Sequence, residues 1–463
     1  MTTRRDFLAR GMAATASLAL PRQLRAATLG FQPLEARAAS VRLAPASYPE
    51  TEIWGYDGTM PGPELRLAQG ARLQRAFVNR LPQPSSVHWH GIRIDNAMDG
   101  VAGLTQPAVE PGQSFEYDFV APDAGTYWYH AHNRSAEQVA RGLYGALIVE
   151  ESAPPDVDRE EVLILDDWLL NPKTAQIDPE FTSRHDRSHA GRHGNFITTN
   201  GRYALSIEVH QNERLRLRIV NAANARIFVL ALEGMEGWYV ALDGMPLAQP
   251  EPVTEALILG PGQRVDLIVD VTAGPDETAH LVRLDNQDAA SQVAFPVTAK
   301  ASATRRAAPY PLPPNPRMEV AGLDDARTTL LDMQGGAMGT LEAAILNGEK
   351  KSFRELADAN QFWSFNGTVG MTDVPLLNVS KGEAVKLQIY NDTSFPHAMH
   401  LHGLHFREIG EEGDLGPLRD TILMFAGQTR SIGFVADNPG DWLLHCHMLS
   451  HASSGMMTWI KVT

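Results

Sequence analysis

Cysteine is nearly absent from this chain, which has one, Cys446, among its 463 residues. A single cysteine excludes an intrachain disulfide, so its thiol is free, modified or bound to a metal. No uninterrupted apolar run reaches the length that crosses a bilayer, and we therefore expect no stable membrane insertion. The net charge of −15 at pH 7 argues against a surface for nucleic acid or anionic membranes.

Glycine and proline are plentiful, with 38 and 30 residues, and so many turn formers favour a β-rich fold. Three segments repeat one pattern in which apolar and polar residues alternate, as in a half-buried strand. A turn containing Gly-Gln opens another alternating strand downstream of each segment. We interpret the repeat as three similar β-sandwich domains. The repeated segments are residues 70–79, 212–221 and 382–391, and the turns are residues 111–113, 261–263 and 426–428.

Prolines indicate where the domains end. Pro154 and Pro155 follow an apolar strand directly, and proline cannot donate to a sheet ladder. Five prolines between residues 309 and 316 are typical of an extended linker, and a helical patch is expected near residues 341–357. The predicted division is an export signal at residues 1–27, domain 1 at 40–152, domain 2 at 153–300, a Pro-rich linker at 301–340 and domain 3 at 341–463.

The amino terminus carries Arg4 and Arg5, followed by a weakly apolar stretch at residues 9–20. This pattern resembles a twin-arginine export signal, with cleavage expected near Ala26 or Ala27. A merely disordered basic terminus is the alternative. The signal predicts that the twin-arginine export machinery carries the folded protein into a bacterial periplasm, where the signal is removed.

Ten of the sixteen histidines fall in four clusters, and Cys446 lies in the last of them. In a strand, residues two apart point to the same face, so each close pair can aim into one cavity. Eight paired imidazoles are enough for three metal ions. The middle domain offers His210 and His280, neither in a pair, so we expect the metal between domains 1 and 3. The pairs are His88 with His90, His130 with His132, His400 with His402, and His445 with His447.

Cys446 lies between the members of the last pair and must point to the opposite face of its strand. There it can meet His397, whose odd spacing from His400 also turns it away from the pairs. His451 and Met456 arrive from the following loop. Two imidazoles, one thiolate and a weak thioether describe a blue electron-transfer copper. One peptide bond joins Cys446 to each neighbouring histidine, which gives an electron a short covalent route to the eight paired imidazoles.

The four clusters resemble the copper-ligand signatures of the multicopper oxidases, which are laccase-like enzymes. The resemblance rests on the patterns HxxHxH and HCHxxxHxxxxM and covers essentially the whole mature chain, including residues 59–63 and 126–130. It implies an all-β fold of three tandem cupredoxin-like Greek-key β-sandwich domains. It also implies four copper ions: one of type 1, one of type 2 and two of type 3. A small reducing substrate would give single electrons to the type 1 copper, and O2 would be reduced to two waters at the other three.

The same resemblance assigns a role to each ligand. The type 1 ligands would be His397, Cys446, His451 and Met456, of which the first three, with Asp99, are the expected catalytic residues. The type 2 pair would be His88 and His400. One type 3 copper would be held by His90, His130 and His447, and the other by His132, His402 and His445.

Asp99 lies eleven residues after His88 and is similar in position to the acid that relays protons to the three-copper cluster of related enzymes. Reduction of dioxygen consumes protons, so a carboxylate in that cavity has a chemical purpose. An ordinary Asp-Gly turn is the alternative. A second relay acid follows the last type 1 histidine in some relatives, but that position is Ala452 here, so this chain departs from the family at that point.

Other residues near the clusters have simpler interpretations. His185, His189 and His193 recur at four-residue spacing and could bind a labile metal on a helix, but Gly191 and Gly194 favour a solvated loop. His405 is expected to support a neighbouring ligand or to pack. The aromatic and sulfur side chains beside the ligands are expected to fill the core, and these are Trp89, Trp128, Trp442, Met448 and Met457.

We therefore predict a periplasmic multicopper oxidase that oxidises a phenol or aromatic amine, with Cu(I) or Mn(II) as competing donors. The lack of a long methionine-rich insertion disfavours a dedicated cuprous oxidase. A copper-free structural or cell-division protein on the same scaffold is one alternative, although all twelve ligand positions are filled. A two-domain nitrite reductase or a simple electron carrier is another, and neither needs so many histidine pairs. Copper content distinguishes these possibilities.

Overall fold

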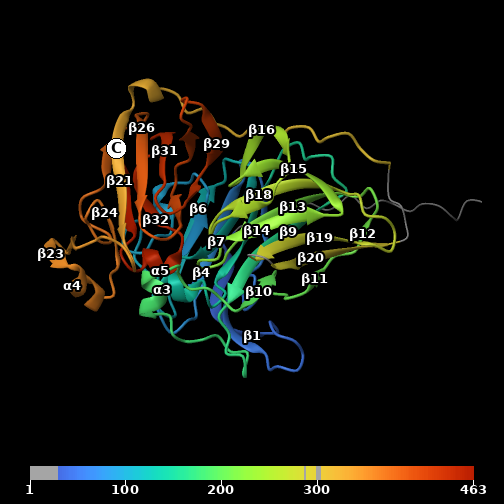
Figure 1. The fold of residues 1–463 in the computed structure, drawn as a ribbon, viewed down its shortest axis with the longest axis horizontal. Coiled ribbons are helices and arrows are strands. Elements are labelled where there is room, and N and C mark those ends of the chain that lie inside the picture. Colours follow the sequence, from blue (N-terminus) through green and yellow to red (C-terminus); the bar gives the residue numbers. More distant parts are fainter. Residues whose placement is uncertain (1–29, 286–287, 299–303) are drawn as a thin grey trace, which may run out of the picture.

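The computed structural model describes residues 30–285, 288–298 and 304–463 (Figure 1). The predicted export signal at residues 1–27 lies outside the described residues. Strands make up nearly half of the described chain, and its helices are short. Within this part of the chain, no helix combines the length and the apolar character that crossing a bilayer requires.

The first domain is a sandwich of two four-stranded sheets, ordered β2-β1-β4-β6 and β3-β8-β7-β5. Phe77, Trp89 and Tyr117 are buried in its core, and the rings of Trp89 and Tyr117 meet edge to face at 5.4 Å. The elements are β1 (Gln32–Val41), β2 (Thr51–Tyr56), β3 (Leu65–Ala68), β4 (Arg72–Asn79), β5 (Val87–His90), η1 (Asn96–Met98), β6 (Ser114–Val120), β7 (Gly125–Ala131), α2 (Ser135–Gln138) and β8 (Tyr144–Glu150).

The second domain has sheets ordered β10-β9-β13-β18-β15-β16 and β11-β20-β19-β14-β17, with β12 paired to β20. The elements are β9 (Arg159–Trp168), α3 (Arg184–Ser188), β10 (Phe196–Thr199), β11 (Leu205–Ser206), β12 (Val209–His210), β13 (Arg214–Asn221), β14 (Phe228–Glu233), β15 (Met235–Leu242), β16 (Met245–Pro252), β17 (Leu257–Leu259), β18 (Arg264–Val271), β19 (Thr278–Asp285) and β20 (Asp288–Thr298).

The third domain has sheets ordered β24-β21-β26-β31-β28-β29 and β25-β33-β32-β27-β30, and a separate hairpin of β22 and β23. The elements are η2 (Leu323–Asp325), β21 (Arg327–Gly335), β22 (Ala343–Leu346), β23 (Glu349–Ser352), α4 (Phe353–Asp358), β24 (Trp363–Phe365), β25 (Leu377–Val379), β26 (Ala384–Asp392), β27 (His397–Leu401), β28 (Phe406–Ile409), β29 (Leu415–Arg419), β30 (Thr421–Met424), β31 (Thr429–Val435), β32 (Gly440–Cys446), α5 (Leu449–Ala452) and β33 (Met457–Val462).

The threefold repeat predicted from the sequence is confirmed by the strand pairing. The repeated segments form β4, β13 and β26, and each pairs in parallel with the first strand of its domain. Each also pairs antiparallel with the strand that opens after the Gly-Gln turn. The glycine of each turn has a positive φ, which explains why glycine recurs there: the angles are 78° at Gly112, 82° at Gly262 and 73° at Gly427.

The structure differs from two predictions for the region after residue 301. Strand β21 lies inside the predicted linker at residues 301–340, yet it pairs along its length with β26, so the third domain's sheet begins before residue 341. The predicted helical patch at residues 341–357 is mostly the β22–β23 hairpin, and α4 begins only at Phe353. Asn347 and Gly348 both have positive φ, which suits a tight hairpin turn and interrupts a helix.

The middle domain contacts both of its neighbours. Strand β7 of domain 1 packs against β13 and β18, and β16 packs against β29 of domain 3. Figure 1 shows the third domain, in orange and red, on one side of the molecule and the second, in green and yellow, on the other. This arrangement brings one sheet of domain 1 against one sheet of domain 3.

Candidate metal centres

The paired histidines lie where a sheet of domain 1 faces a sheet of domain 3. Strands β5 and β7 are neighbours in the first sheet, and β27 and β32 are neighbours in the second. The rings of His88 and His402 stack across the boundary with their centroids 3.9 Å apart. The rings of His90 and His400 stack in the same way at 3.7 Å. Imidazoles from both domains therefore form one cluster.

Three of the eight histidines follow the end of a strand rather than lying within it. Strands β7, β27 and β32 end at Ala131, Leu401 and Cys446. Alternation along a strand therefore applies strictly only to His88 and His90. For the other pairs, the direction of the chain just beyond the strand brings the second imidazole into the cluster, and these histidines are His132, His402 and His447.

The donor atoms of this cluster lie close enough to share ions. Three groups of three histidines have donor atoms within 4.8 Å of one another. His447 joins through His130, because their Nε2 atoms are 3.5 Å apart. All eight of the predicted histidines thus lie within one cluster. The groups are His88, His90 and His130; His88, His400 and His402; and His132, His402 and His445.

Hydrogen bonds select which nitrogen of each ring faces a metal. In the cluster, Nδ1–H of His88 donates to the carbonyl of Asp99 at 2.8 Å, and Nδ1–H of His400 donates to the carbonyl of Asp420 at 3.0 Å. The Nε2 lone pairs of these rings are therefore left for metal. Donation from the outer ring nitrogen is the usual way in which a protein orients a metal-binding histidine.

A second centre surrounds Cys446. Its Sγ lies 3.5 Å from Nδ1 of His397 and 3.9 Å from Nδ1 of His451, and the two nitrogens are 3.1 Å apart. Nε2 of His397 shares a hydrogen bond of 2.8 Å with Thr393 Oγ1, which leaves Nδ1 for metal. Met456 is fully buried in the same core, and its carbonyl accepts a hydrogen bond from the Cys446 amide at 3.1 Å.

Tryptophans lie closer to both centres than the sequence predicted. Trp363, which the sequence analysis missed, packs against the rings of His397 and His451 at 5.0 and 4.4 Å. Trp128 was expected only to fill the core, but its ring also lies 4.3 Å from that of His130. Trp363 is at least 34 residues from any ligand in the chain, so no local pattern could have indicated it.

Asp99 lies between the two domains that form the cluster. Its Oδ2 accepts a hydrogen bond of 3.0 Å from Nδ1–H of His402 in domain 3. Its Oδ1 lies 3.2 Å from Nδ1 of His88 in domain 1. The carboxyl group is buried and touches a histidine from each domain, which an ordinary surface turn would not do.

Asp420 is a second buried acid of the cluster, and the sequence analysis missed it. It lies between β29 and β30, with Oδ1 at 3.5 Å from Nε2 of His90 and 3.3 Å from Nδ1 of His400. Arg264 of the middle domain donates to both carboxylate oxygens, at 2.9 and 2.6 Å. Asp420 is twenty residues from the nearest of these histidines in the chain, so its spacing carries no signal.

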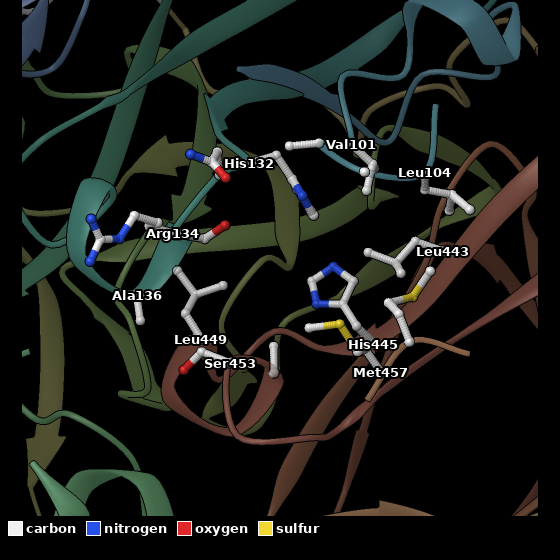
Figure 2. Close-up of a pocket in the computed structure, with 16 residues that line it drawn as sticks. Val101, Leu104, His132, Arg134, Ala136, Leu443, His445, Leu449, Ser453 and Met457 are labelled. Carbon is white, nitrogen blue, oxygen red and sulfur yellow. The ribbon is translucent and has the colours of Figure 1, made fainter. Parts of the chain in front are cut away.

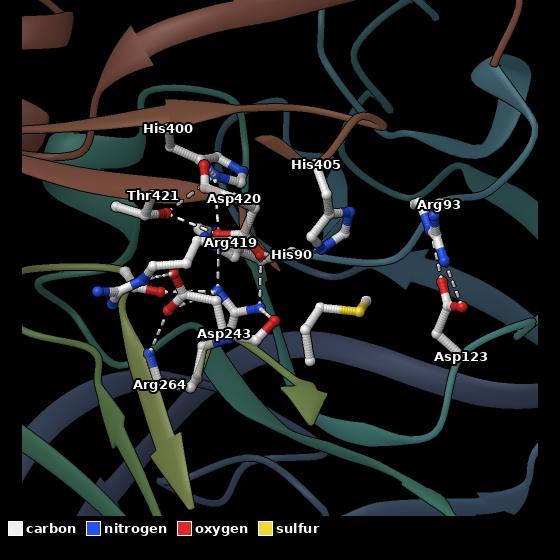
Figure 3. A network of polar contacts seen from close by, with 12 residues as sticks. His90, Arg93, Asp123, Asp243, Arg264, His400, His405, Arg419, Asp420 and Thr421 are labelled. Atoms are coloured by element: carbon white, nitrogen blue, oxygen red, sulfur yellow. Dashed lines mark hydrogen bonds and ion pairs between the residues drawn. The ribbon is translucent and has the colours of Figure 1, made fainter. Parts of the chain in front are cut away.

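Arg264 is fully buried and contacts all three domains (Figure 3). Besides Asp420, it donates to the carbonyls of Asp243 at 2.8 Å and Thr126 at 3.3 Å. Burial raises the pKa of Asp420, but Arg264, His400 and His90 together outweigh this effect and hold the pKa well below its usual range. His405 lies with Nε2 at 3.6 Å from Asp420, so it supports the cluster from outside rather than joining it.

Burial keeps the imidazoles neutral, which is the form that binds metal. It lowers the pKa of His445 and His451 to about 3, and lowers that of His397 well below its usual value. Burial has the opposite effect on Cys446 and raises the pKa of its thiol to about 12. A metal that binds Cys446 must therefore displace a proton.

Comparison with known proteins assigns the chain to a family. Domain models described as multicopper oxidase match residues 37–154, 159–300 and 347–463. Multicopper oxidase MmcO of Mycobacterium tuberculosis is 32% identical over 441 residues, which cover 87% of this chain and 82% of that protein. The chain belongs to the multicopper oxidase family. It is a laccase-like copper oxidoreductase that reduces dioxygen, and its histidine clusters match the type 1 and trinuclear sites of four coppers.

Solved structures agree with this family. The multicopper oxidase of Pseudomonas thermotolerans superposes with a TM-score of 0.81 at 31% identity, covering 94% of this chain and 99% of that one. Lac15 from a marine microbial metagenome is 41% identical, with a TM-score of 0.75 and coverage of 94% and 100%. The predicted all-β fold of three cupredoxin-like domains is therefore confirmed.

The residues of this oxidase fit copper. The Nε2 atoms of His88, His132 and His400 are buried and have no hydrogen-bond partner. A buried polar atom without a partner is unfavourable, and three such lone pairs in one cluster indicate that a ligand completes them. The Cys446 centre adds the thiolate and imidazoles that suit an electron-transfer copper.

A cavity of about 320 Å³ reaches the oxidase's trinuclear cluster from outside (Figure 2). His132 and His445 form part of its wall, and Val101, Leu104 and Leu449 make much of the rest apolar. None of the residues that line the cavity is acidic, and one of them is Ala452. This path suits a small apolar gas better than it suits proton delivery.

Proposed function

We propose that this multicopper oxidase takes single electrons from a small donor at the Cys446 centre and passes them to the histidine cluster. The proposal is supported chiefly by one observation. The sulfur of Cys446 lies within 4 Å of His397 and His451, whereas the residues on either side of it in the chain belong to the eight-histidine cluster. One strand, β32, thus connects the two centres.

The proposed ligand roles follow this division. When bound, copper supplies the one-electron redox chemistry that the side chains themselves lack. His445 donates Nδ1–H to the carbonyl of Cys446 at 2.9 Å, so a hydrogen bond runs beside the covalent connection. The proposed type 1 ligands are His397, Cys446, His451 and Met456; the type 2 ligands are His88 and His400; and the type 3 ligands are His90, His130 and His447 for one copper and His132, His402 and His445 for the other.

The proposed donors are phenols, aromatic amines, Cu(I) or Mn(II). The ring of Trp363 packs against the imidazole rings of His397 and His451, so aromatic side chains enclose the type 1 centre. Such a centre suits electron transfer from varied small donors. Among the curated relatives, copper resistance protein A of Escherichia coli is 25% identical over 88% of each chain, and its name points towards metal-ion donors. A periplasmic location, reached through the twin-arginine machinery, is proposed from Arg4 and Arg5.

Copper content is the direct test of this function. The purified protein is expected to hold four coppers per chain and to show intense thiolate-to-copper absorption. Oxygen uptake with a panel of phenols, aromatic amines, Cu(I) and Mn(II) then identifies the donor. No bound copper would instead indicate a structural protein on the same scaffold, and a single copper would indicate an electron carrier.

Asp99→Asn is expected to slow reoxidation of the fully reduced enzyme by dioxygen by at least about 100-fold, the usual contribution of a positioned proton donor. Asparagine keeps the size of the side chain and an acceptor for His402, but it cannot carry the proton at Oδ2. Reduction of the type 1 copper by the donor should be unchanged. Stopped-flow absorbance measures both steps.

Asp95→Asn is the matched control for this prediction, because Asp95 is an exposed acid of the same loop. It should leave both rates at the wild-type value. If Asp99→Asn were reoxidised as quickly as the wild type, Asp99 would not be the proton donor.

A further inference from the structure

The two imidazoles of the Cys446 centre are each held by a hydrogen bond at Nε2, the ring nitrogen that faces away from the centre. Nε2–H of His451 donates to the main-chain carbonyl of His189 at 2.7 Å, which covers the outer edge of this ring. Nε2 of His397 bonds instead to a side chain, with Oγ1 of Thr393 at 2.8 Å. A main-chain carbonyl is present whatever the residue. Only the hydrogen bond of His397 therefore depends on the identity of a side chain.

The His189 carbonyl is held in place by packing between domains. Helix α3 ends directly before His189 and packs against α5, which carries His451. The indole N–H of Trp363 donates to the carbonyl of Arg187 at 2.6 Å. The sequence favoured a solvated loop for this segment, whereas the structure forms a short helix up to Ser188. The support of His451 is thus part of the main-chain architecture.

The Thr393 hydroxyl uses its full hydrogen-bonding capacity. It donates to Oδ1 of Asn391 at 2.7 Å and accepts the amide N–H of Phe395 at 3.2 Å. The other oxygen near it, the Phe395 carbonyl at 3.1 Å, is also an acceptor. A hydroxyl has one hydrogen to donate and two lone pairs, so it offers a lone pair to His397. Thr393 therefore keeps the hydrogen of His397 on Nε2 and leaves Nδ1 for metal.

The same asparagine turn occurs in all three domains, which gives an internal comparison. The asparagine at the end of each repeated segment donates from Nδ2 to two main-chain carbonyls, and its Oδ1 accepts the amide N–H of the residue two positions later. Only in domain 3 does that later residue carry a hydroxyl, so the turn itself does not require one. The asparagines are Asn79, Asn221 and Asn391, and the residues two positions later are Leu81, Ala223 and Thr393.

We propose that Thr393 is a positioning residue that sets the reduction potential of the type 1 copper through His397. The inference rests on the proposed function, because it takes His397 to be a type 1 ligand. An imidazole that donates from its outer nitrogen is a more basic ligand, and a more basic ligand stabilises Cu(II) more than Cu(I). Thr393 and Asn391 are both buried, which strengthens their hydrogen bonds. Thr393 thus lowers the potential of the centre and restricts its donors to stronger reductants.

Thr393→Val in the copper-loaded enzyme tests this role, because valine keeps the shape of the side chain and removes the acceptor for His397. Titration of the blue absorption against a mediator of known potential gives the reduction potential. The equilibrium should shift at least about tenfold towards reduced copper, the smallest effect usual for a residue that supports a metal ligand. For a one-electron couple this is a rise of about 59 mV. Thr393→Ser should restore the wild-type potential, since serine supplies the same hydroxyl.

Thr198→Val is the matched control, because Thr198 is another buried threonine whose hydroxyl accepts a ring N–H, that of Trp168 at 3.0 Å in the middle domain. Its type 1 potential should equal that of the wild type. The inference would be overturned by an equal shift in both valine variants, by an unchanged or lowered potential in Thr393→Val, or by failure of Thr393→Ser to restore it.

Two further outcomes separate this inference from the proposed function. Loss of the blue band in Thr393→Val, with the band present in Thr393→Ser, would support the inference, because His397 would then no longer be held for metal. A blue, active wild type whose potential does not depend on Thr393 would overturn the inference and leave the proposed function standing. A wild type without blue copper would overturn both.

Discussion

Cys446→Ser is expected to abolish the blue absorption and the oxidase activity while the protein still folds. A hydroxyl is a poor copper ligand and has no thiolate charge-transfer band, so the type 1 centre is lost. The eight-histidine cluster contains no atom of the Cys446 side chain and should retain its metal. Copper content should therefore fall from four to three per chain. Absorption spectra, copper analysis and oxygen uptake measure these effects.

Met448→Leu is the control for Cys446→Ser, because it removes another buried sulfur of the same core two residues away. It should keep the blue colour and the activity, as expected of a side chain that fills space. Oxygen uptake by Cys446→Ser at the wild-type rate, with the same donor, would show that electrons reach the cluster without this centre.

Arg264→Met should destabilise the protein by about 3–5 kcal/mol, the usual effect of removing one partner from a buried ion pair. The substitution leaves the Asp420 carboxylate buried without its bidentate partner. Asp420 then no longer holds the outer nitrogens of His90 and His400, so type 2 copper should also be lost. Denaturant unfolding reports the first effect, and the electron paramagnetic resonance signal of type 2 copper reports the second.

Arg93→Met is the matched control, because Arg93 and Asp123 form another buried bidentate pair, at 2.7 and 2.6 Å, outside the histidine cluster. Figure 3 shows both pairs. Arg93→Met should be destabilised to a similar degree but keep its type 2 signal. The double variant Arg264→Met/Asp420→Asn should recover part of the lost stability, since no unpaired charge remains. A normal type 2 signal in Arg264→Met would show that Asp420 needs no support from the middle domain.

The middle domain therefore does more than separate its neighbours. It has no two histidines that lie two residues apart, and from its sequence we expected a spacer. Its Arg264 holds an acid that touches ligands of domains 1 and 3, and its His189 carbonyl bonds to His451. Neither contact is visible in the chain, because each joins residues more than 150 positions apart.

Local patterns were enough to predict the repeat and the ligand clusters. Alternation in β4, β13 and β26 follows from strand geometry, and each close histidine pair lies within three consecutive residues. The linker and the helical patch were less predictable. Proline content does not predict strand β21, because the position of this strand depends on its pairing with β26. The hairpin turn at Asn347 and Gly348 overrides the helix propensity of the residues around it.

Side-chain chemistry and short-range spacing thus identify this chain as a copper protein with a thiolate between two imidazoles. Within β32, strand geometry sends the adjacent side chains of His445 and Cys446 to opposite faces. Packing of the three domains brings together what spacing cannot: the stacking of His88 on His402, the support of Asp420 by Arg264, and the cover of His451 by His189. Contacts between distant segments depend on how whole sheets pack against one another, and no local sequence pattern determines that packing.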